Sequence, residues 1–235
     1  MSTLYMIRHA QASFGKADYD RLSDLGEKQA HVLAVHLQQT VAGFDSIYSG
    51  RQLRHAQTLE AYEKVCAKEK NAFPPVKKTD AFNEYDAEKI LRTVIPILIK
   101  EEPAFEADVA RMLTDNRCFQ KVFEKAMMKW GNNARFDGLE TSESFADRVY
   151  QGIQDIILKE GSGKKVAVFT SGGCISAVIQ KTLGLSNEDT LKLSWQIVNT
   201  SVTRFKYSGN RLMLFGFNEF AHLELTNDKR LITYR

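Results

Sequence analysis

The stretch Ile7-Arg8-His9-Ala10-Gln11 decides how the chain is interpreted, because it places an Arg–His pair directly after a short apolar run. Residues 3–7 alternate as in a strand and are too few to span a membrane. The pair therefore falls where a strand leaves a sheet, which is where open α/β folds bind ligands. An imidazole there can act as nucleophile or base, and an adjacent guanidinium suits phosphate. Taken alone, the dipeptide also fits a surface arginine beside a capping histidine.

Composition bounds the class of protein. The chain has 235 residues, 43% of them hydrophobic and 26% charged, which is ordinary for a soluble globular domain. A net charge of +3 gives no electrostatic case for nucleic acid or membrane binding. The three cysteines are widely spaced and fit neither a disulfide framework nor a zinc site. No signal-peptide pattern opens the chain, so we expect a cytoplasmic protein.

Apolar periodicity predicts alternating strands and helices, and hence a mainly parallel sheet with helices on both faces. We expect strands at 3–7, 46–48, 76–82, 165–170, 200–207 and 212–217, and helices at about 24–40, 52–70, 143–159 and 172–183. Ser23 is a plausible N-cap for the first helix. The segment of about 87–135 looks like a helical insertion. Within it we expect an apolar packing stripe formed by Val122, Phe123, Ala126, Met127 and Trp130.

Further motifs follow the Arg–His pair along the chain. They are Leu22–Gly26 with Gln29-Ala30, Ser49–Thr58, Phe82-Asn83-Glu84, Glu143-Ser144-Phe145 with Arg148, Val168–Gly173, and Asn218 with His222-Leu223. In this order they resemble the histidine phosphatase superfamily, with its phosphoglycerate-mutase-like fold, over residues 4–223. The resemblance implies a single three-layer α/β/α domain over residues 1–235, with an insertion that can cover the site. It also implies a phosphomonoester phosphatase that works through a phosphohistidine and needs no cofactor or metal.

Two positions depart from the family pattern. The third residue of the opening motif is Ala10, where the family has Gly, and Ser171 stands where the family carries a second histidine. A serine hydroxyl can donate one hydrogen bond but has no positive charge. Losing one charged contact to the phosphoryl group costs roughly 2–4 kcal/mol of transition-state stabilisation. The chain is then either a weakly active phosphatase or a non-catalytic phosphoester-binding or regulatory protein, and a phosphoglycerate mutase is less favoured.

Three residues are expected to form the core of the reaction site. His9 is the candidate nucleophile, since imidazole has an ordinary pKa of about 6.5 and is largely unprotonated near neutrality. Arg8 and Arg54 would clamp the phosphoryl group with paired N–H donors. Arg51 competes with Arg54 on proximity, but the Arg-x-Ala-x-Thr context of Arg54, which ends at Thr58, matches the family motif.

A proton donor for the leaving group is expected at Glu84, which corresponds to the acid of the family. Its pKa must be raised by burial or by the anionic phosphate for it to work near neutrality. Asp86 and Glu88 are close enough in sequence to substitute for it.

The remaining candidates would bind substrate. Gln11 and Ser13 lie in the loop after the nucleophile, and Ser171-Gly172 forms a phosphate cradle at a helix N-terminus. His55, beside Arg54, could line the site, although adjacent helical residues point about 100° apart.

Two other interpretations of the turn at Ser171 are weak. A hydrolase nucleophile would need a Gly two residues before it, where this chain has Phe169. A dinucleotide loop would need the Gly-x-Gly-x-x-Gly pattern, which is absent. The resemblance implies a small phosphorylated molecule or a phosphoprotein as the partner, and the net charge gives no reason to expect nucleic acid or a membrane.

Overall fold

The computed structural model describes residues 2–13, 20–41, 43–70, 72–132 and 135–234. Its six strands form one sheet in the order β3-β2-β4-β1-β5-β6. The strands are β1 (Ser2–Arg8), β2 (Ser46–Ser49), β3 (Val76–Lys78), β4 (Lys165–Thr170), β5 (Val202–Ser208) and β6 (Arg211–Glu219). The first four run parallel, and β5 and β6 form an antiparallel hairpin at one end. The mainly parallel sheet predicted from the sequence is confirmed.

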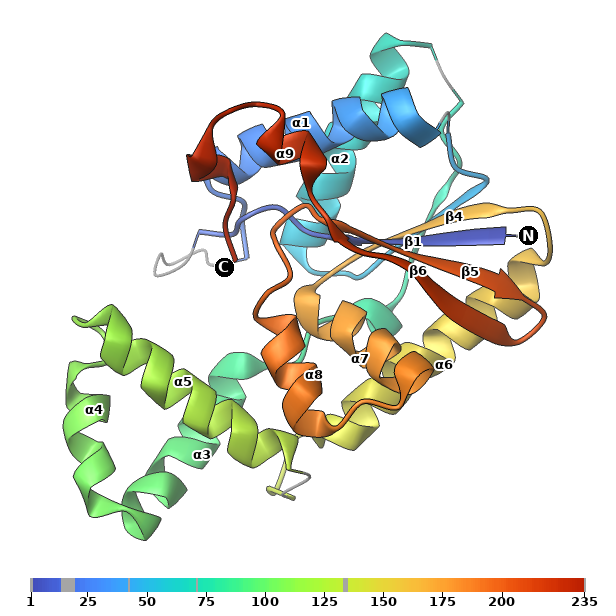
Figure 1. Ribbon diagram of the computed structural model, residues 1–235. Helices are drawn as coiled ribbons and strands as arrows, with labels where there is room; N and C mark the ends of the chain where they lie inside the picture. Colours follow the sequence, from blue (N-terminus) through green and yellow to red (C-terminus); the bar gives the residue numbers. More distant parts are fainter. Residues whose placement is uncertain (1, 14–19, 42, 71, 133–134, 235) are drawn as a thin grey trace.

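Helices cover both faces of this sheet (Figure 1). Helices α1 (Asp24–Val41) and α2 (Leu53–Lys68) lie on one face, and α6 (Ser142–Glu160) and α7 (Gly172–Leu183) lie on the other. Alternation along β4 explains the two cores, because Ala167 and Phe169 pack in the cluster with α1 and α2 whereas Val166 and Val168 pack with α6 and α7. The three-layer α/β/α architecture is confirmed.

Three helices fall within the segment predicted as an insertion: α3 (Ala87–Glu101), α4 (Glu106–Arg111) and α5 (Asn116–Gly131). Figure 1 shows them grouped away from the sheet, beyond α7 and α8 (Asn187–Ser194). The expected apolar stripe of α5 is buried except at Phe123, which is only half-buried. A short α9 (Ala221–Glu224) follows the hairpin, and neither α8 nor α9 was anticipated from the sequence.

Two strands are shorter than predicted, for local reasons. The strand expected at 76–82 ends at Lys78, because the Thr79 side chain accepts a hydrogen bond from the backbone N–H of Ala81 and starts a 3-10 turn at Asp80–Phe82. The strand expected from residue 200 begins at Val202, because Thr200 has φ of +64°, in the left-handed region. The first helix begins as expected, with the Ser23 hydroxyl accepting from the N–H of Gly26.

The parallel pairing of β1 with β4 is what assembles the site. Arg8 lies opposite Thr170 in the register, and the His9 N–H donates to the Thr170 carbonyl over 2.9 Å. The carboxyl ends of both strands therefore meet at one edge of the sheet, with His9 on one and Ser171 on the other. No helix within the described residues is long and apolar enough to cross a membrane.

Candidate functional site

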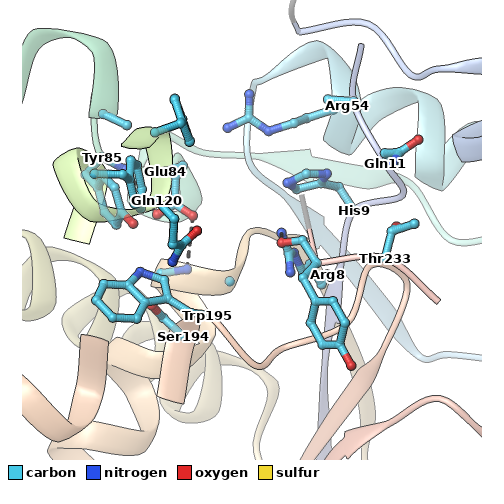
Figure 2. A pocket seen from close by; sticks show the side chains of 17 residues that line it. Arg8, His9, Gln11, Arg54, Glu84, Tyr85, Gln120, Ser194, Trp195 and Thr233 are labelled. Carbon is cyan, nitrogen blue, oxygen red and sulfur yellow. Dashed lines mark hydrogen bonds between the residues drawn. The ribbon is translucent and has the colours of Figure 1, made fainter. Parts of the chain in front are cut away.

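A cavity of about 560 Å³ opens at this edge of the sheet. Its wall is formed by Arg8, His9, Gln11, Ala12, Arg54, Glu84, Tyr85, Ala87, Phe119, Gln120, Phe123, Gly172, Gly173, Ser194, Trp195, Thr233 and Tyr234. Figure 2 shows its labelled side chains in two groups that face each other. One group holds Arg8, His9, Gln11, Arg54 and Thr233, and the other holds Glu84, Tyr85, Gln120, Ser194 and Trp195.

The imidazole of His9 is held in one tautomer. Its Nδ1 lies 2.7 Å from the carbonyl oxygen of Ala10, and because a carbonyl only accepts, Nδ1 carries the proton. Nε2 is then the atom with a lone pair. Burial, with the guanidiniums of Arg54 and Arg8, holds the pKa of His9 well below its ordinary value. A neutral imidazole beside two cations is the state that a phosphoryl nucleophile needs.

Ala10 replaces the expected glycine without strain. Its backbone does not adopt a positive φ, so a Cβ carries no conformational cost there. The methyl group is fully buried in a small cluster with Leu22 and Ala30. Its N–H donates to the Thr58 hydroxyl over 3.0 Å, which ties the nucleophile loop to α2. This departure from the family motif therefore leaves the backbone at His9 supported.

The two arginines converge on the cavity from different elements. Arg8 is the last residue of β1, and its guanidinium donates to the backbone carbonyls of Ile197 and Tyr234. Arg54 comes from the first turn of α2 and donates from Nη1 to the Asp20 carboxylate over 2.7 Å. The other oxygen of Asp20 accepts from the N–H of Leu53 at the N-terminus of α2, where an anion is favoured. Asp20 thus fixes the guanidinium of Arg54.

The competing candidates on neighbouring positions are engaged elsewhere. Arg51 is exposed and pairs with Asp80 over 3.2 Å, so Arg54 is the arginine of this motif that lines the cavity. Asp86 caps α3 by accepting from the N–H of Lys89, and Glu88 pairs with Arg92 on the surface. Neither carboxylate belongs to the cavity wall.

Glu84 reaches the cavity because the residue opposite it is a glycine. One oxygen of Glu84 accepts from the N–H of Gly173 over 3.0 Å. A Cβ on Gly173 would lie 2.2 Å from the other oxygen, so a larger residue there would displace the Glu84 carboxylate. Burial raises the pKa of Glu84, and this effect outweighs the N–H of Gly173 and the guanidinium of Arg54, which both lower it. A carboxyl with a raised pKa can hold a proton for a leaving group.

The backbone before Glu84 is anchored by Arg148, which belongs to the Glu143-Ser144-Phe145 motif region. Its Nη1 donates to the carbonyls of Asp80, Ala81 and Asn83, while Nε and Nη2 pair with both oxygens of Glu140. The Thr170 hydroxyl donates to the Phe82 carbonyl over 2.8 Å. Arg148 is therefore a positioning residue for the acid, outside the cavity wall.

The expected substrate-binding residues divide into two groups. Gln11 and Gly172 line the cavity, whereas Ser13 and Ser171 are buried outside its wall. Residues 14–19, which follow Ser13, lie outside the described residues. The Ser171 hydroxyl oxygen lies 2.7 Å from Nε2 of His55, and both side chains have 0% exposure. His55 thus sits behind the cavity and does not line it.

His222 and Asn218 are structural, as expected for the end of the fold. His222 is buried, stacks on His36 at a centroid distance of 5.1 Å and contacts the Thr200 hydroxyl. Asn218 accepts from the N–H of Val198 and donates to the carbonyl of Gln196. Within the described residues there is no group of three or more His, Cys, Asp or Glu arranged to hold a metal ion.

Sequence reasoning missed several residues of the site. Asp20 carries no motif, and its role depends on a contact with Arg54 that only the folded chain creates. Phe119 and Gln120 of α5 belong to the insertion, which no pattern places against the cavity. Trp195 and Tyr234 arrive from the end of α8 and from the C-terminal segment. Phe123 was expected to pack within the apolar stripe of α5. It is instead half-buried and lines the cavity.

Comparisons with known proteins agree with this geometry. The profile of the histidine phosphatase superfamily (branch 1) matches residues 4–114 and 110–219. No curated protein sequence matches the chain. Phosphoserine phosphatase from Entamoeba histolytica, solved with 3-phosphoglyceric acid, has 18% identity and a TM-score of 0.64, with 95% of this chain and 100% of that chain covered.

Two further solved structures share the fold. Phosphoglycerate mutase from Bacillus anthracis has 18% identity and a TM-score of 0.63, with 97% of each chain covered. The mycobacterial glucosyl-3-phosphoglycerate phosphatase with inorganic phosphate has 19% identity and a TM-score of 0.62, covering 94% of this chain and 98% of that one. At these identities the likeness concerns the fold.

Proposed function

Because this chain belongs to the histidine phosphatase superfamily (branch 1), we propose that it is a phosphomonoester phosphatase that forms a phosphohistidine on His9. The observation that carries the proposal is the hydrogen bond from His9 Nδ1 to the Ala10 carbonyl. It leaves Nε2 unprotonated in a cavity that also holds Arg8, Arg54 and Glu84. A nucleophile, two cations and an acid are what phosphoryl transfer through a protein side chain requires.

In the first step, Nε2 of His9 attacks phosphorus and the bond from phosphorus to the leaving oxygen breaks. The leaving oxygen takes a proton from Glu84, a role that the burial-raised pKa of this carboxyl favours. Arg8 and Arg54 offset the charge on the equatorial oxygens, with the N–H of Gly172 at the start of α7 as a neutral donor. Two of the Arg8 nitrogens also donate to the carbonyls of Ile197 and Tyr234, and these hydrogen bonds fix the orientation of the guanidinium.

In the second step, water attacks phosphorus on the opposite face to Nε2. Glu84, now a carboxylate, accepts a proton from that water, and the bond from phosphorus to Nε2 breaks. Inorganic phosphate leaves, and both His9 and Glu84 return to their starting protonation states. The cycle balances with protein groups and water, and the leaving alcohol is the first product.

A non-catalytic phosphoester-binding protein is the second candidate. Two observations favour it. Ser171 is fully buried, and the described cavity wall contains no imidazole besides that of His9. Both functions need the same two arginines, and only the phosphatase needs His9 and Glu84. A mutase is less favoured, since it must retain and reorient a phosphorylated intermediate with fewer contacts.

Turnover separates the two candidates. We expect phosphate release from an aryl phosphate by the native protein, loss of that release in His9→Ala, and a large reduction with measurable residual activity in Arg54→Ala. Binding of inorganic phosphate should survive in His9→Ala and weaken in Arg54→Ala. Phosphate binding without any release, at high protein concentration and with several esters, would support the binding protein and contradict the phosphatase.

A further inference from the structure

The cavity wall beyond the phosphate-binding groups is aromatic. Phe119 and Phe123 of α5 stack with ring centroids 5.9 Å apart and interplanar angle 16°. Tyr85, Trp195 and Tyr234 complete this part of the wall from three other segments. Aromatic side chains bury large apolar areas against flat ligands, so this region is built to hold an apolar group.

The volume leaves room for such a group. At about 560 Å³ the cavity is in the range of sites that enclose a small organic ligand. A phosphoryl group occupies only the end that contains His9 and the arginines. The rest of the space lies toward Tyr85, Gln120 and Trp195, which Figure 2 shows across the cavity from His9. The leaving group of a bound ester must therefore lie among these side chains.

Positive charge in the described part of the wall is confined to the phosphate end. In the described part of the chain, the cationic side chains of the wall are Arg8 and Arg54. Lysines of α5 are directed elsewhere: Lys121, Lys125 and Lys129 pair with Asp108, Glu102 and Glu101. A carboxylate or second phosphate on the leaving group would enter an aromatic wall without a counter-charge, which is costly.

Gln120 supplies a neutral polar contact in the same region. It lies on α5 between the two phenylalanines, and its amide nitrogen donates to Glu124 one turn along the helix. The carboxamide oxygen is an acceptor suited to a hydroxyl or N–H of the ligand. Such a group would orient a flat leaving group without adding charge.

From this wall we infer the substrate class: phosphate monoesters of an uncharged alcohol that carries an aromatic ring system. This inference rests on the proposed phosphatase function and narrows it. Phe119, Phe123 and Trp195 determine the preference by packing on the ring. Esters with a second anionic group are disfavoured because the described residues of this region include no cation to pair with it. The same chemistry disfavours small sugar-acid phosphates as substrates.

The test compares esters of similar intrinsic reactivity. Benzyl phosphate and 2-naphthylmethyl phosphate are alkyl esters, as are phosphoserine and 3-phosphoglycerate, so differences in leaving-group activation are small. We expect kcat/KM for 2-naphthylmethyl phosphate to exceed that for 3-phosphoglycerate by at least about tenfold, the factor that burying part of an aromatic ring provides. Benzyl phosphate should fall between them.

Variants of Phe123 locate the preference in the wall. Phe123→Ala should lower the ratio of kcat/KM for 2-naphthylmethyl phosphate over 3-phosphoglycerate about tenfold, since it removes most of one aromatic face. Phe123→Arg should lower it further, because a cation there attracts the carboxylate of 3-phosphoglycerate. Phe215→Ala, an exposed phenylalanine of β6 outside the cavity, is the matched control and should leave the ratio unchanged.

The outcomes separate this inference from the proposed function. Equal or higher kcat/KM for 3-phosphoglycerate or phosphoserine, or a ratio that Phe123→Ala and Phe123→Arg do not alter, would overturn the substrate class while phosphatase activity stands. Release of phosphate from none of the four esters, nor from an aryl phosphate, would instead overturn the proposed function. A ratio measured on each variant cancels any loss of folded protein.

Discussion

Nε2 of His55 lies 2.7 Å from the hydroxyl oxygen of Ser171, with both side chains fully buried. Ser171 is the residue that we expect from the sequence to stand at the position of the family's second histidine. The His55 ring centroid is 5.6 Å from that of His9. A second imidazole therefore lies close to His9. It belongs to His55 of α2 and contacts the Ser171 hydroxyl. Ser171 is the N-cap residue of α7, so His55 contacts the residue at the start of that helix.

The first prediction concerns exchanging these two side chains. Ser171→His alone should lower both Tm and kcat, because the buried His55 ring leaves no space for a second imidazole. His55→Ala alone should also lower kcat, since it leaves the Ser171 hydroxyl without its partner. The double variant His55→Ala, Ser171→His opens that space and puts the imidazole at the end of β4.

We expect the double variant to have a kcat above both single variants, and up to about 10² above Ser171→His, the order of one phosphoryl contact. Steady-state kinetics with an aryl phosphate and thermal unfolding measure the two effects separately. If the losses of the single variants simply add in the double variant, the two residues are not coupled.

The second prediction is the pH profile of kcat/KM. His9 must be neutral, so activity is lost as the pH falls through its pKa, which burial, Arg54 and Arg8 hold well below the ordinary value. Glu84 must be protonated, so activity with alkyl esters is lost as the pH rises through its pKa, which burial raises. The optimum should therefore lie on the acidic side of neutrality.

Arg54→Ala removes a cation that lowers both of these pKa values. Its residual activity should show both limbs of the profile moved to higher pH. An optimum above neutrality in the native protein, or limbs that Arg54→Ala leaves in place, would contradict the assignment of these two groups.

The third prediction tests the glycine opposite the acid. In Gly173→Ala the new Cβ would lie 2.2 Å from the Glu84 carboxylate, so Glu84 must move. We expect kcat for an alkyl phosphate to fall by about 10²–10⁴, the range for losing a general acid. With 4-nitrophenyl phosphate, whose leaving group needs no proton, the loss should be much smaller.

Glu84→Gln is the matched comparison for Gly173→Ala, since it removes the proton and keeps the size. Both variants should show the same difference between the two esters. A loss in Gly173→Ala of equal size for both esters would show that the glycine serves the fold or the phosphate, and not the acid.

The fourth prediction concerns Asp20, whose carboxylate pairs with Arg54 at 2.7 Å. Asp20→Asn keeps one acceptor oxygen, enough for either Arg54 or the N–H of Leu53, and removes a negative charge beside the bound phosphate. The inhibition constant of inorganic phosphate should fall about three- to tenfold, which corresponds to one partly exposed charge contact. Asp24→Asn, on the first turn of α1, is a control for a loss of charge outside the cavity wall.

Much of the fold was predictable because apolar periodicity and turn residues act locally. The apolar run of β4 and the capping of α1 by Ser23 are properties of neighbouring residues, and both the strand and the cap were predicted. The early end of β3 was not, because the Thr79 side chain competes for backbone hydrogen bonds in a way that strand propensity does not register.

In the site too, residues in local motifs were predictable, whereas residues brought together by tertiary packing were not. His9, Arg8, Arg54 and Glu84 stand in motifs at strand or helix ends, and the structure brings all four into one cavity. The aromatic wall could not be predicted, since Phe119 and Trp195 meet there only through tertiary packing of segments without motifs. The burial of Ser171 likewise follows from the size of a side chain on another helix, His55.

The central claim is that His9 carries the phosphoryl group during turnover. Rapid quenching of the protein with an aryl phosphate, followed by peptide mapping in alkali, tests it directly, because phosphohistidine survives base and is lost in acid. We predict an acid-labile phosphoryl group on the peptide that contains His9, and none in His9→Ala. Steady turnover that leaves His9 unlabelled, or equal labelling of His9→Ala, would contradict the account.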